Sequence, residues 1–417
     1  MIDPIQHQVK NKHSFIVYYQ GFIAVAAVLV FFTKSSVYLE RQGIGMPLLW
    51  LIAFLFASLP LCYNLLERLH FIPTSMIIWT LAYLALPFIS ILLSPLDLEL
   101  QLLEDHIRSV IFLLLMLLLF SQHPQVLTWV KLAIISITVI AVFMYIYEFF
   151  NPTFFYLEQH APGRSSGFYH DGNESAAALI IGMIFTIDYI KPKYRLLYAL
   201  FILLGIAPTF SRGGMLCWLA VIIFFIIVKI IPRQQLPLLF LSIFATATIV
   251  SSQLNNLVYL TTDDGESLFN EGTLARVEFL IDPLGQQDSS SSSRLSYVDE
   301  SWLKFANKPF LGNGIGSGAN PEYISARGTA QRSHNVYLDK MVEYGFLGAL
   351  IYPLGLIACV WKAEGELKKY AWSFVLFCLV YGIFTHISLS AFFLLLSYAI
   401  MANMTMQSRL ANLDRKH

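Results

Sequence analysis

Four arginines and one histidine stand out in this sequence because each lies in a polar segment between apolar runs. They are Arg164, Arg212, Arg294, Arg332 and His334. A guanidinium group can bind phosphate through paired hydrogen bonds, and a neutral imidazole can accept a proton near neutral pH. The combination suits a reaction in which arginines hold a phosphate-bearing substrate while the histidine acts as a general base.

The histidine belongs to a polar segment that leads into a helix. Ser333 or Asn335 can cap that helix, which places His334 at the helix N-terminus. The positive end of the helix dipole disfavours the charged imidazolium, so it favours the neutral form that a general base needs. A histidine that only caps or packs is the alternative, and it is the commoner role for a lone histidine.

Arg294 follows a run of five serines, residues 289–293, which indicates a flexible hinge. Apolar residues then recur at helical spacing and predict an amphipathic helix over residues 294–306: Leu295, Val298, Trp302 and Phe305. With Ser293 as the N-cap, Arg294 lies in the first turn, where a helix N-terminus and a guanidinium together form an anion site. A merely solvated arginine is the alternative.

The segment after this helix is rich in glycine. Pro309 ends the helix, and Gly312, Gly314, Gly316 and Gly318 then alternate with other residues. The spacing is not that of a dinucleotide-binding loop, and no strand–helix–strand unit surrounds it. We therefore expect a tight turn with an exposed backbone.

The composition shows which kind of element must position these residues. Of the 417 residues, 57% are hydrophobic and 13% are charged, and the mean hydropathy is +0.63. A soluble domain carries about 25% charged residues, so a soluble enzyme, a disordered chain and a disulfide scaffold are excluded. The four cysteines lie in apolar runs without a C-x-x-C pair, and we expect no disulfide and no metal site.

The fold class predicted is an all-α, polytopic membrane protein. Apolar runs of about 20 residues predict about twelve transmembrane helices. They span residues 14–33, 46–66, 72–94, 107–121, 127–149, 173–190, 194–210, 213–231, 236–251, 341–361, 371–389 and 391–405. Three regions follow: residues 1–251 with nine spans, a large polar loop over 252–340, and residues 341–417 with three spans and a tail.

Lysine and arginine gather in alternate short loops, which predicts that both termini are cytoplasmic. The large loop then faces outward, as do the segments around Arg164 and Arg212 and the acidic stretch 96–105. An interfacial arginine is often only an anchor. Four arginines on the outer side oppose the usual charge bias, however, and this favours a functional role for them. Asn173, which follows Arg164 in the same outer segment, is a further candidate.

Two ionisable residues fall inside predicted spans, His386 in the eleventh and Asp188 near the inner end of the sixth. Such groups can mark the path of a transporter. Asp188 is close enough to the inner interface to be solvated, and no acidic pair lies deep in the spans. Structural roles are therefore favoured for both residues.

Four motifs, in this order on one face, resemble the O-antigen ligase and polymerase superfamily of the Wzy_C type. They are Arg164-Ser-Ser-Gly with Asn173-Glu-Ser-Ala; Ser211-Arg-Gly; Ser293-Arg-Leu with Lys308-Pro-Phe-Leu-Gly-Asn-Gly-Ile-Gly-Ser; and Ser333-His-Asn-Val-Tyr-Leu with Glu343-Tyr-Gly-Phe-Leu-Gly. Each motif is weak alone, but the ordered set covers roughly residues 164–348 and is specific.

The resemblance implies a GT-C-type glycosyltransferase of the bacterial inner membrane, with its active site facing the periplasm. Its donor would be a glycan on undecaprenyl diphosphate, and in the ligases the acceptor is a sugar hydroxyl of lipid A-core. Arg212, Arg294 and His334 match residues essential in the family, and Arg164 matches one whose role is less settled. Arg332, Asn335 and Asn173 are secondary candidates. Family members are metal-independent, so no metal or other cofactor is expected.

The mechanism expected is a direct, inverting displacement in which arginines stabilise the leaving diphosphate and His334 takes the proton of the acceptor hydroxyl. The helix over 294–306 is either a lid on the membrane surface or an ordinary packing element. The bilayer is the expected environment, no nucleic acid is expected, and the oligomeric state is open. The alternatives are a polysaccharide polymerase, then a protein O-oligosaccharyltransferase, and last a polysaccharide transporter.

Overall fold

The computed structural model describes residues 4–64, 69–93, 99–151, 154–155, 164–169, 171–239, 241, 289–324 and 330–414. Over these ranges the protein is helical apart from one short hairpin. In that hairpin β1 (Asn320–Ile324) pairs antiparallel with β2 (Ala330–Gln331). The hairpin lies in the large loop, which was expected to be only partly helical, and the remaining described elements agree with the predicted all-α class. The chain divides into two compact units, Met1–Ile134 with Tyr297–His417, and Ile135–Ser296.

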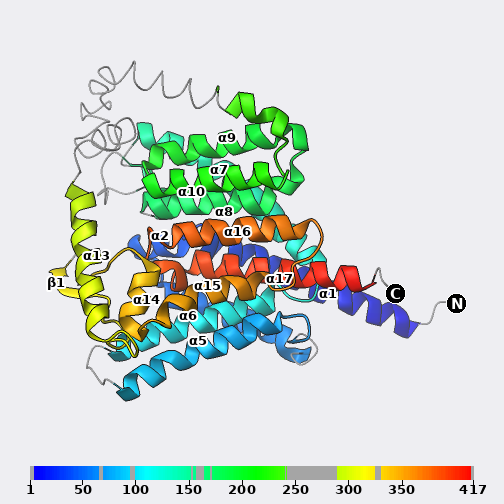
Figure 1. Ribbon diagram of the computed structural model, residues 1–417. Coiled ribbons are helices and arrows are strands. Elements are labelled where there is room, and N and C mark those ends of the chain that lie inside the picture. Colours follow the sequence, from blue (N-terminus) through cyan, green and yellow to red (C-terminus); the bar gives the residue numbers. More distant parts are fainter. Residues whose placement is uncertain are drawn as a thin grey trace. The chain divides into compact units, whose positions relative to one another are not determined.

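Unit 1 is a bundle of long helices (Figure 1). Its central helices are α5 (Thr74–Leu93), α6 (Glu99–Leu119), α15 (Gly348–Val360) and α17 (Phe392–Asp414), where α15 and α6 each pack against both α5 and α17. The other elements of this unit are α1 (Pro4–Ala27), η1 (Val28–Phe32), α2 (Ser35–Arg41), α3 (Pro47–Ser58), η2 (Leu59–Asn64), α14 (Val336–Tyr344), α16 (Leu367–Tyr381) and η8 (Ile387–Leu389).

Aromatic side chains fill the centre of unit 1. The rings of Phe112 and Phe392 stack with centroids 4.3 Å apart, and Phe31 meets the edge of Phe112 at 4.8 Å. Such pairs contribute beyond the area they bury. The beginning of α1 and the end of α17 lie toward one end of unit 1, and α14 lies at the other end (Figure 1).

Unit 2 is built around α8 (Gly172–Thr186), which packs against α9 (Arg195–Ile206) and α10 (Arg212–Ile227). Every residue of α8 except Asn173 and Glu174 is buried. Small residues allow this close packing, since a Cβ on Gly214 would lie 2.5 Å from the Cβ of Ala176. The rest of this unit comprises most of α7 (Pro124–Phe150), η3 (Gly167–Tyr169), η4 (Ile187–Tyr189), η5 (Pro192–Tyr194), η6 (Ala207–Thr209) and η7 (Arg233–Gln235).

Two helices within the described ranges are long and apolar enough to cross a membrane, Phe15–Phe32 and Pro124–Phe150. Only 44% and 39% of these spans are buried. Large apolar side chains point outward from them instead, such as Phe22 and Phe143, which are 75% and 61% exposed. Hydrocarbon tolerates such a surface and water does not. These features are consistent with a helical membrane protein, while the number of twelve spans and the GT-C architecture remain predictions.

The predicted tenth span, 341–361, is not one helix. It is divided into α14 and α15 at Gly345, whose φ is +69°. A Cβ at Gly345 would lie 2.3 Å from the carbonyl oxygen of Phe310, because the chain after Pro309 crosses here. Hydropathy detects apolar length but not this crossing, so the sequence prediction merged two helices.

The predicted eleventh span, 371–389, ends early. Helix α16 stops at Tyr381, and residues 382–391 form a loop that contains only the short η8. Gly382 follows the helix end, where a Cβ would lie 2.7 Å from the ring of Tyr352. His386 is therefore a loop residue, and its placement inside a span was wrong.

Two other helices begin earlier than predicted. The amphipathic helix is α13 (Ser289–Asn307), so the serine run is helical and not a hinge. Serine disfavours a helix interior only slightly, so the run of serines can be helical. Ser293 is consequently not the N-cap, and Arg294 lies in the second turn of α13. Helix α6 likewise begins at Glu99 and takes up most of the acidic stretch 96–105. Residues 242–288, which include most of the predicted ninth span (236–251), lie outside the described residues.

Candidate functional site

In unit 2 the guanidinium of Arg164 is fixed at the ends of two helices. Its Nε donates to the carbonyl oxygen of Thr209 at 2.8 Å, and its Nη2 donates to Oδ1 of Asn173 at 3.4 Å. Asn173 Oδ1 also accepts from the hydroxyl of Ser211 at 2.8 Å. One amide oxygen thus joins Arg164 to the residue that directly precedes Arg212.

Arg212 is the first residue of α10, and Ser211 is its N-cap. The Ser211 hydroxyl accepts from the amide of Gly214 at 3.0 Å. A neutral cap leaves the positive end of the helix dipole uncompensated by charge, beside a guanidinium that is itself half-buried. This end of α10 therefore attracts an anion more strongly than an isolated surface arginine would.

The neighbouring helix α8 has a different electrostatic character at its N-terminus. Its N-cap is the carboxylate of Asp171, which accepts from the amide of Asn173 at 2.7 Å, and Glu174 adds a second acidic group in the first turn. These charges offset the dipole of α8. The N-terminus of α10, which begins with an arginine behind a neutral cap, thus differs in charge from that of α8.

The segment that carries Arg164 is held by a carboxylate of α7. Glu148 Oε2 accepts from the amides of Ser166 and Gly167 at 2.8 and 2.7 Å. The hydroxyl of Ser165 donates to the carbonyl oxygen of Tyr145 at 2.7 Å. Backbone and side chain together fix the direction of this segment, so the position of Arg164 does not depend on a ligand.

In unit 1 His334 lies at the entrance to α14, as predicted. The N-cap is Asn335, whose Oδ1 accepts from the amides of Tyr337 and Leu338 at 3.0 and 3.1 Å. His334 has a φ of +53°, in the left-handed region that L-residues rarely adopt. Strained backbone at a half-buried polar residue of a loop is a feature that recurs at functional sites.

His334 meets a second histidine that the sequence analysis did not assign to the site. The ring of His386 lies 5.2 Å from that of His334, centroid to centroid, with the planes at 65°. The loop that carries His386 is attached to α14, because the amide of Val336 donates to the carbonyl oxygen of Gly382 at 3.0 Å. A polar cluster after an apolar run, Thr385 to Ser390, was the sequence signal that this segment is not membrane-spanning.

Arg332, a secondary candidate for phosphate binding, is occupied by ion pairs in the structure. Its Nη1 lies 3.0 Å from the Asp339 carboxylate and 3.4 Å from that of Glu343, and the Arg332 side chain is only 18% exposed. Asp339 and, secondarily, Glu343 raise the pKa of the guanidinium above its ordinary value despite burial. Lys340 also pairs with Glu343. We therefore assign Arg332 to holding the loop.

The carboxylate of Glu343 also connects α14 to the glycine-rich turn. Glu343 Oε1 accepts from the amide of Gly316 at 2.9 Å, and its backbone oxygen accepts from Gly314 at 3.1 Å. Gly312 has a φ of +73°, and a Cβ there would lie 2.3 Å from the Glu343 carbonyl oxygen. The expected tight turn is thus present, and it supports the helix that follows His334.

Helix α13 leads into this turn. Lys304 forms an ion pair with Glu300 at 3.0 Å and donates to the carbonyl oxygens of Ser317 and Ala319 at 3.5 and 3.3 Å. Trp302 and Leu303 are 55% and 66% exposed. An apolar face turned outward suits a membrane surface. Arg294 is a helical residue of α13, in the part of the chain assigned to unit 2.

Comparison with known families decides the affiliation. Residues 197–352 match the family model Wzy_C, described as O-antigen ligase. The chain carries a Wzy_C domain. This confirms the superfamily that the four motifs indicate. The Wzy_C domain contains Arg212, Arg294 and His334, whereas Arg164 and Asn173 precede it.

No curated protein matches the chain. Among solved structures, one chain from "Structural coordination of polymerization and crosslinking by a peptidoglycan synthase complex" is similar over 82% of this chain and 98% of that chain. The two are 15% identical, with a TM-score of 0.45. Members of the Wzy_C family are membrane enzymes that transfer glycans, as ligases or polymerases.

Proposed function

We propose that this chain is an O-antigen ligase. It transfers a glycan from undecaprenyl diphosphate to a sugar hydroxyl of lipid A-core, at the periplasmic face of the bacterial inner membrane. The observation that carries the proposal is the Wzy_C match, which spans both the arginine that begins α10 and the histidine that precedes α14. The bilayer holds the lipid tails of both substrates, so only their head groups enter the reaction.

The arginines supply the stabilisation of the leaving group in this proposal. Arg212 and Arg294 bind the diphosphate of the donor, and Arg164 supports Arg212 through Asn173 and Ser211. The bond between the anomeric carbon and the diphosphate breaks, and negative charge builds on the departing oxygen. Guanidinium groups, one of them at the N-terminus of α10, stabilise that charge more in the transition state than in the ground state.

His334 is the proposed general base. It accepts the proton of the acceptor hydroxyl while that oxygen forms the new bond to the anomeric carbon, and the configuration inverts. General-base assistance is worth about 10²–10⁴-fold, so the arginines provide the remainder of the acceleration. The proton then leaves His334 for water, and the undecaprenyl diphosphate departs. No metal or cofactor takes part in the proposed step.

We assign His386 a positioning role in this reaction. Its ring meets that of His334 edge to face, and its loop is bonded to the first residue of α14. A base must be held within hydrogen-bond reach of the proton that it abstracts. The packing of one imidazole against the other limits the rotation of His334, which keeps one ring nitrogen directed at the acceptor.

The proposal is tested by lipopolysaccharide gels from a strain that lacks this gene. Complementation with the wild-type chain should restore the ladder, and His334→Asn should not, with polymerised glycan left on undecaprenyl diphosphate. Asn tolerates the left-handed backbone of position 334, so the variant keeps the fold. If the deletion strain carries single repeat units on lipid A-core, the chain is instead the polymerase. If the ladder of the deletion strain is unchanged, both the ligase and the polymerase activity are excluded.

A further inference from the structure

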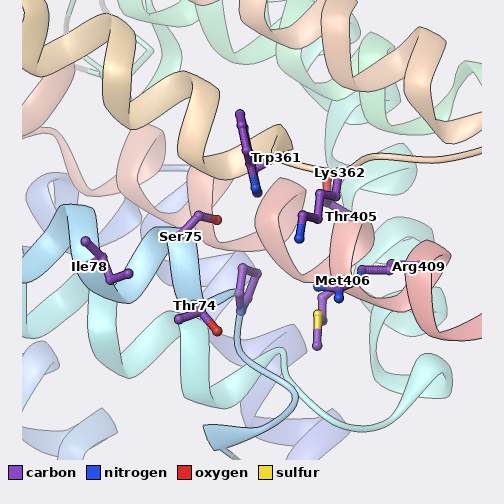
Figure 2. A pocket seen from close by; sticks show the side chains of 9 residues that line it. Thr74, Ser75, Ile78, Trp361, Lys362, Thr405, Met406 and Arg409 are labelled. Carbon is purple, nitrogen blue, oxygen red and sulfur yellow. The ribbon is translucent and has the colours of Figure 1, made fainter.

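A pocket in unit 1 lies at the end of α15 opposite to α14 and His334. It has a volume of about 430 Å³ and lies between the N-terminus of α5, the C-terminus of α15 and the last turns of α17. Lys362 and Arg409 contribute from one side and Thr74 and Ser75 from the other (Figure 2). The volume is within the range of small-molecule sites.

The charges of the pocket are all of one sign. Lys362 and Arg409 line it, and its described lining contains no carboxylate. The nearest acidic groups along the chain are used elsewhere, since Glu364 accepts from Asn412 at 2.9 Å and Glu366 pairs with Lys369 at 2.7 Å. Two cations without an acidic partner in the lining repel each other. An anion bound between them offsets this electrostatic repulsion.

Uncharged donors surround the same space. Thr405 is 2% exposed, and its hydroxyl has no hydrogen-bond partner within the described part of the chain. A buried hydroxyl without a partner is costly, and a ligand acceptor would satisfy it. Helix α5 begins at Thr74, and Thr74 and Ser75 line the pocket, so the positive end of the α5 dipole lies beside it.

The walls also hold apolar groups that suit a lipid. Ile78 is 63% exposed on one side and Trp361 is 57% exposed on the other. The Ser75 hydroxyl donates to the carbonyl oxygen of Ala358 at 2.8 Å, so the α5 and α15 walls are joined and the pocket is formed in advance of a ligand. A tryptophan beside a lysine and an arginine is typical of the level of the headgroups.

We propose that this pocket binds an anionic phosphate group, supplied by a phospholipid headgroup or by free phosphate. Lys362 and Arg409 bind the phosphate oxygens, the Thr405 hydroxyl and the first amides of α5 donate to them, and Ile78 and Trp361 contact the acyl or glycerol part of a lipid. The pocket lies at the end of unit 1 where α1 begins and α17 ends. It is separate from the chemistry proposed for His334 and does not depend on it.

The test uses the purified full-length protein in detergent, with native mass spectrometry to count bound lipids. Phosphatidylglycerol should bind more tightly than phosphatidylcholine of the same chains. The pair Lys362→Gln with Arg409→Gln should weaken phosphatidylglycerol binding by about tenfold or more, because each cation contributes several-fold at a charged interface. Thr405→Val, which keeps the shape of the side chain, should weaken it several-fold. Lys368→Gln is the matched control, since Lys368 is an exposed cation in the first turn of α16, close to Lys362 in sequence but outside the pocket lining.

A second arm distinguishes the source of the phosphate. If millimolar inorganic phosphate binds the wild-type protein but not the double variant, and phosphatidylglycerol shows no preference, the ligand is free phosphate and the anion site stands. If the double variant and Thr405→Val bind lipid and phosphate as well as Lys368→Gln does, the site is overturned. Glycan transfer should be unchanged in all of these variants, so the outcome is independent of the ligase proposal.

Discussion

His334 and His386 show how much of the chemistry depends on two loop residues. The left-handed backbone at position 334, with a φ of +53°, turns the chain so that Asn335 can cap α14. Because His386 follows α16 in a loop, its ring can reach His334 from a segment 52 positions later (386 − 334). The pair is a feature of the fold and not of local sequence.

Replacement of His386 by alanine should lower the rate of glycan transfer by about tenfold and leave the KM for the donor within about twofold. The reason is that His334 keeps its place but loses the ring that orients it. The measurement is a pH–rate profile with the purified enzyme. A positioning role predicts that the titration of the base shifts in His386→Ala and that the variant adds nothing to His334→Asn. An unchanged profile with only reduced yield of folded protein would mean that His386 is structural.

Arg332 makes a different contribution, as the cation between two buried carboxylates. Arg332→Ala should destabilise the protein by roughly 3–5 kcal/mol, because removal of one partner leaves Asp339 and Glu343 buried with less compensation. Arg332→Lys should lose less stability, since lysine keeps the positive charge. The thermal midpoint in detergent measures both. Equal stability of Arg332→Ala and wild type would contradict the assignment to the loop and restore a role in phosphate binding.

At the scale of elements, glycines determine where the outer segments bend. Gly345 separates α14 from α15, and its neighbour across the crossing is the backbone of Phe310. Gly312 is held in the same way against Glu343. Two close approaches between the glycine-rich turn and α14 thus fix the helix whose N-terminus carries His334. Each approach needs both a positive φ and the absence of a side chain.

Gly345→Ala should therefore cost more stability than a change at a glycine that has only a positive φ. Gly43 is the matched control, since its φ is +77° and a Cβ there would contact nothing within 4 Å. Gly43→Ala should lower the free energy of unfolding by about 1 kcal/mol, the conformational cost of a positive φ for alanine. Gly345→Ala should lower it further, because its Cβ also clashes with the Phe310 carbonyl. A smaller loss of thermal stability in Gly345→Ala than in Gly43→Ala would contradict this account of the break.

These elements also show what sequence could and could not predict. The apolar runs placed most helices, and the capping residues placed His334 at a helix N-terminus, because both signals are local. The break at Gly345 and the loop at His386 depend on contacts with Phe310 and Tyr352, which are distant in sequence. The ion pairs of Arg332 were missed for a similar reason, as spacing along the chain does not show that Asp339 and Glu343 are buried.

At the scale of the whole molecule, unit 1 has two chemically different ends. Asn335, His334 and His386 lie at the end occupied by α14, and the beginning of α1, the end of α17 and the Lys362 pocket lie at the other (Figure 1). The predicted topology assigns the first end to the periplasm and the second to the cytoplasm. A reaction at one membrane face and an anion site at the other follow from a single orientation of this unit.

This orientation can be tested by cysteine labelling. The native Cys62 is exposed, whereas Cys217, Cys359 and Cys378 are buried. The Cys62→Ser variant therefore keeps only buried native cysteines, which should react little with a maleimide. In that background, Ser390→Cys should react with a membrane-impermeant maleimide on intact cells, and Lys368→Cys should react only after the membrane is opened. Both positions are exposed in the structure. Labelling of position 368 but not of position 390 on intact cells would reverse the topology.

The measurement that tests the central claim most directly is a transfer assay with purified protein, undecaprenyl-diphosphate-linked glycan and lipid A-core. Wild type should form glycosylated lipid A-core and release undecaprenyl diphosphate. His334→Asn should lose about 10²–10⁴-fold in rate while still binding the donor. Arg212→Ala should instead lose donor binding, because the end of α10 then lacks its cation. Transfer by His334→Asn at the wild-type rate would contradict the proposal that His334 is the base.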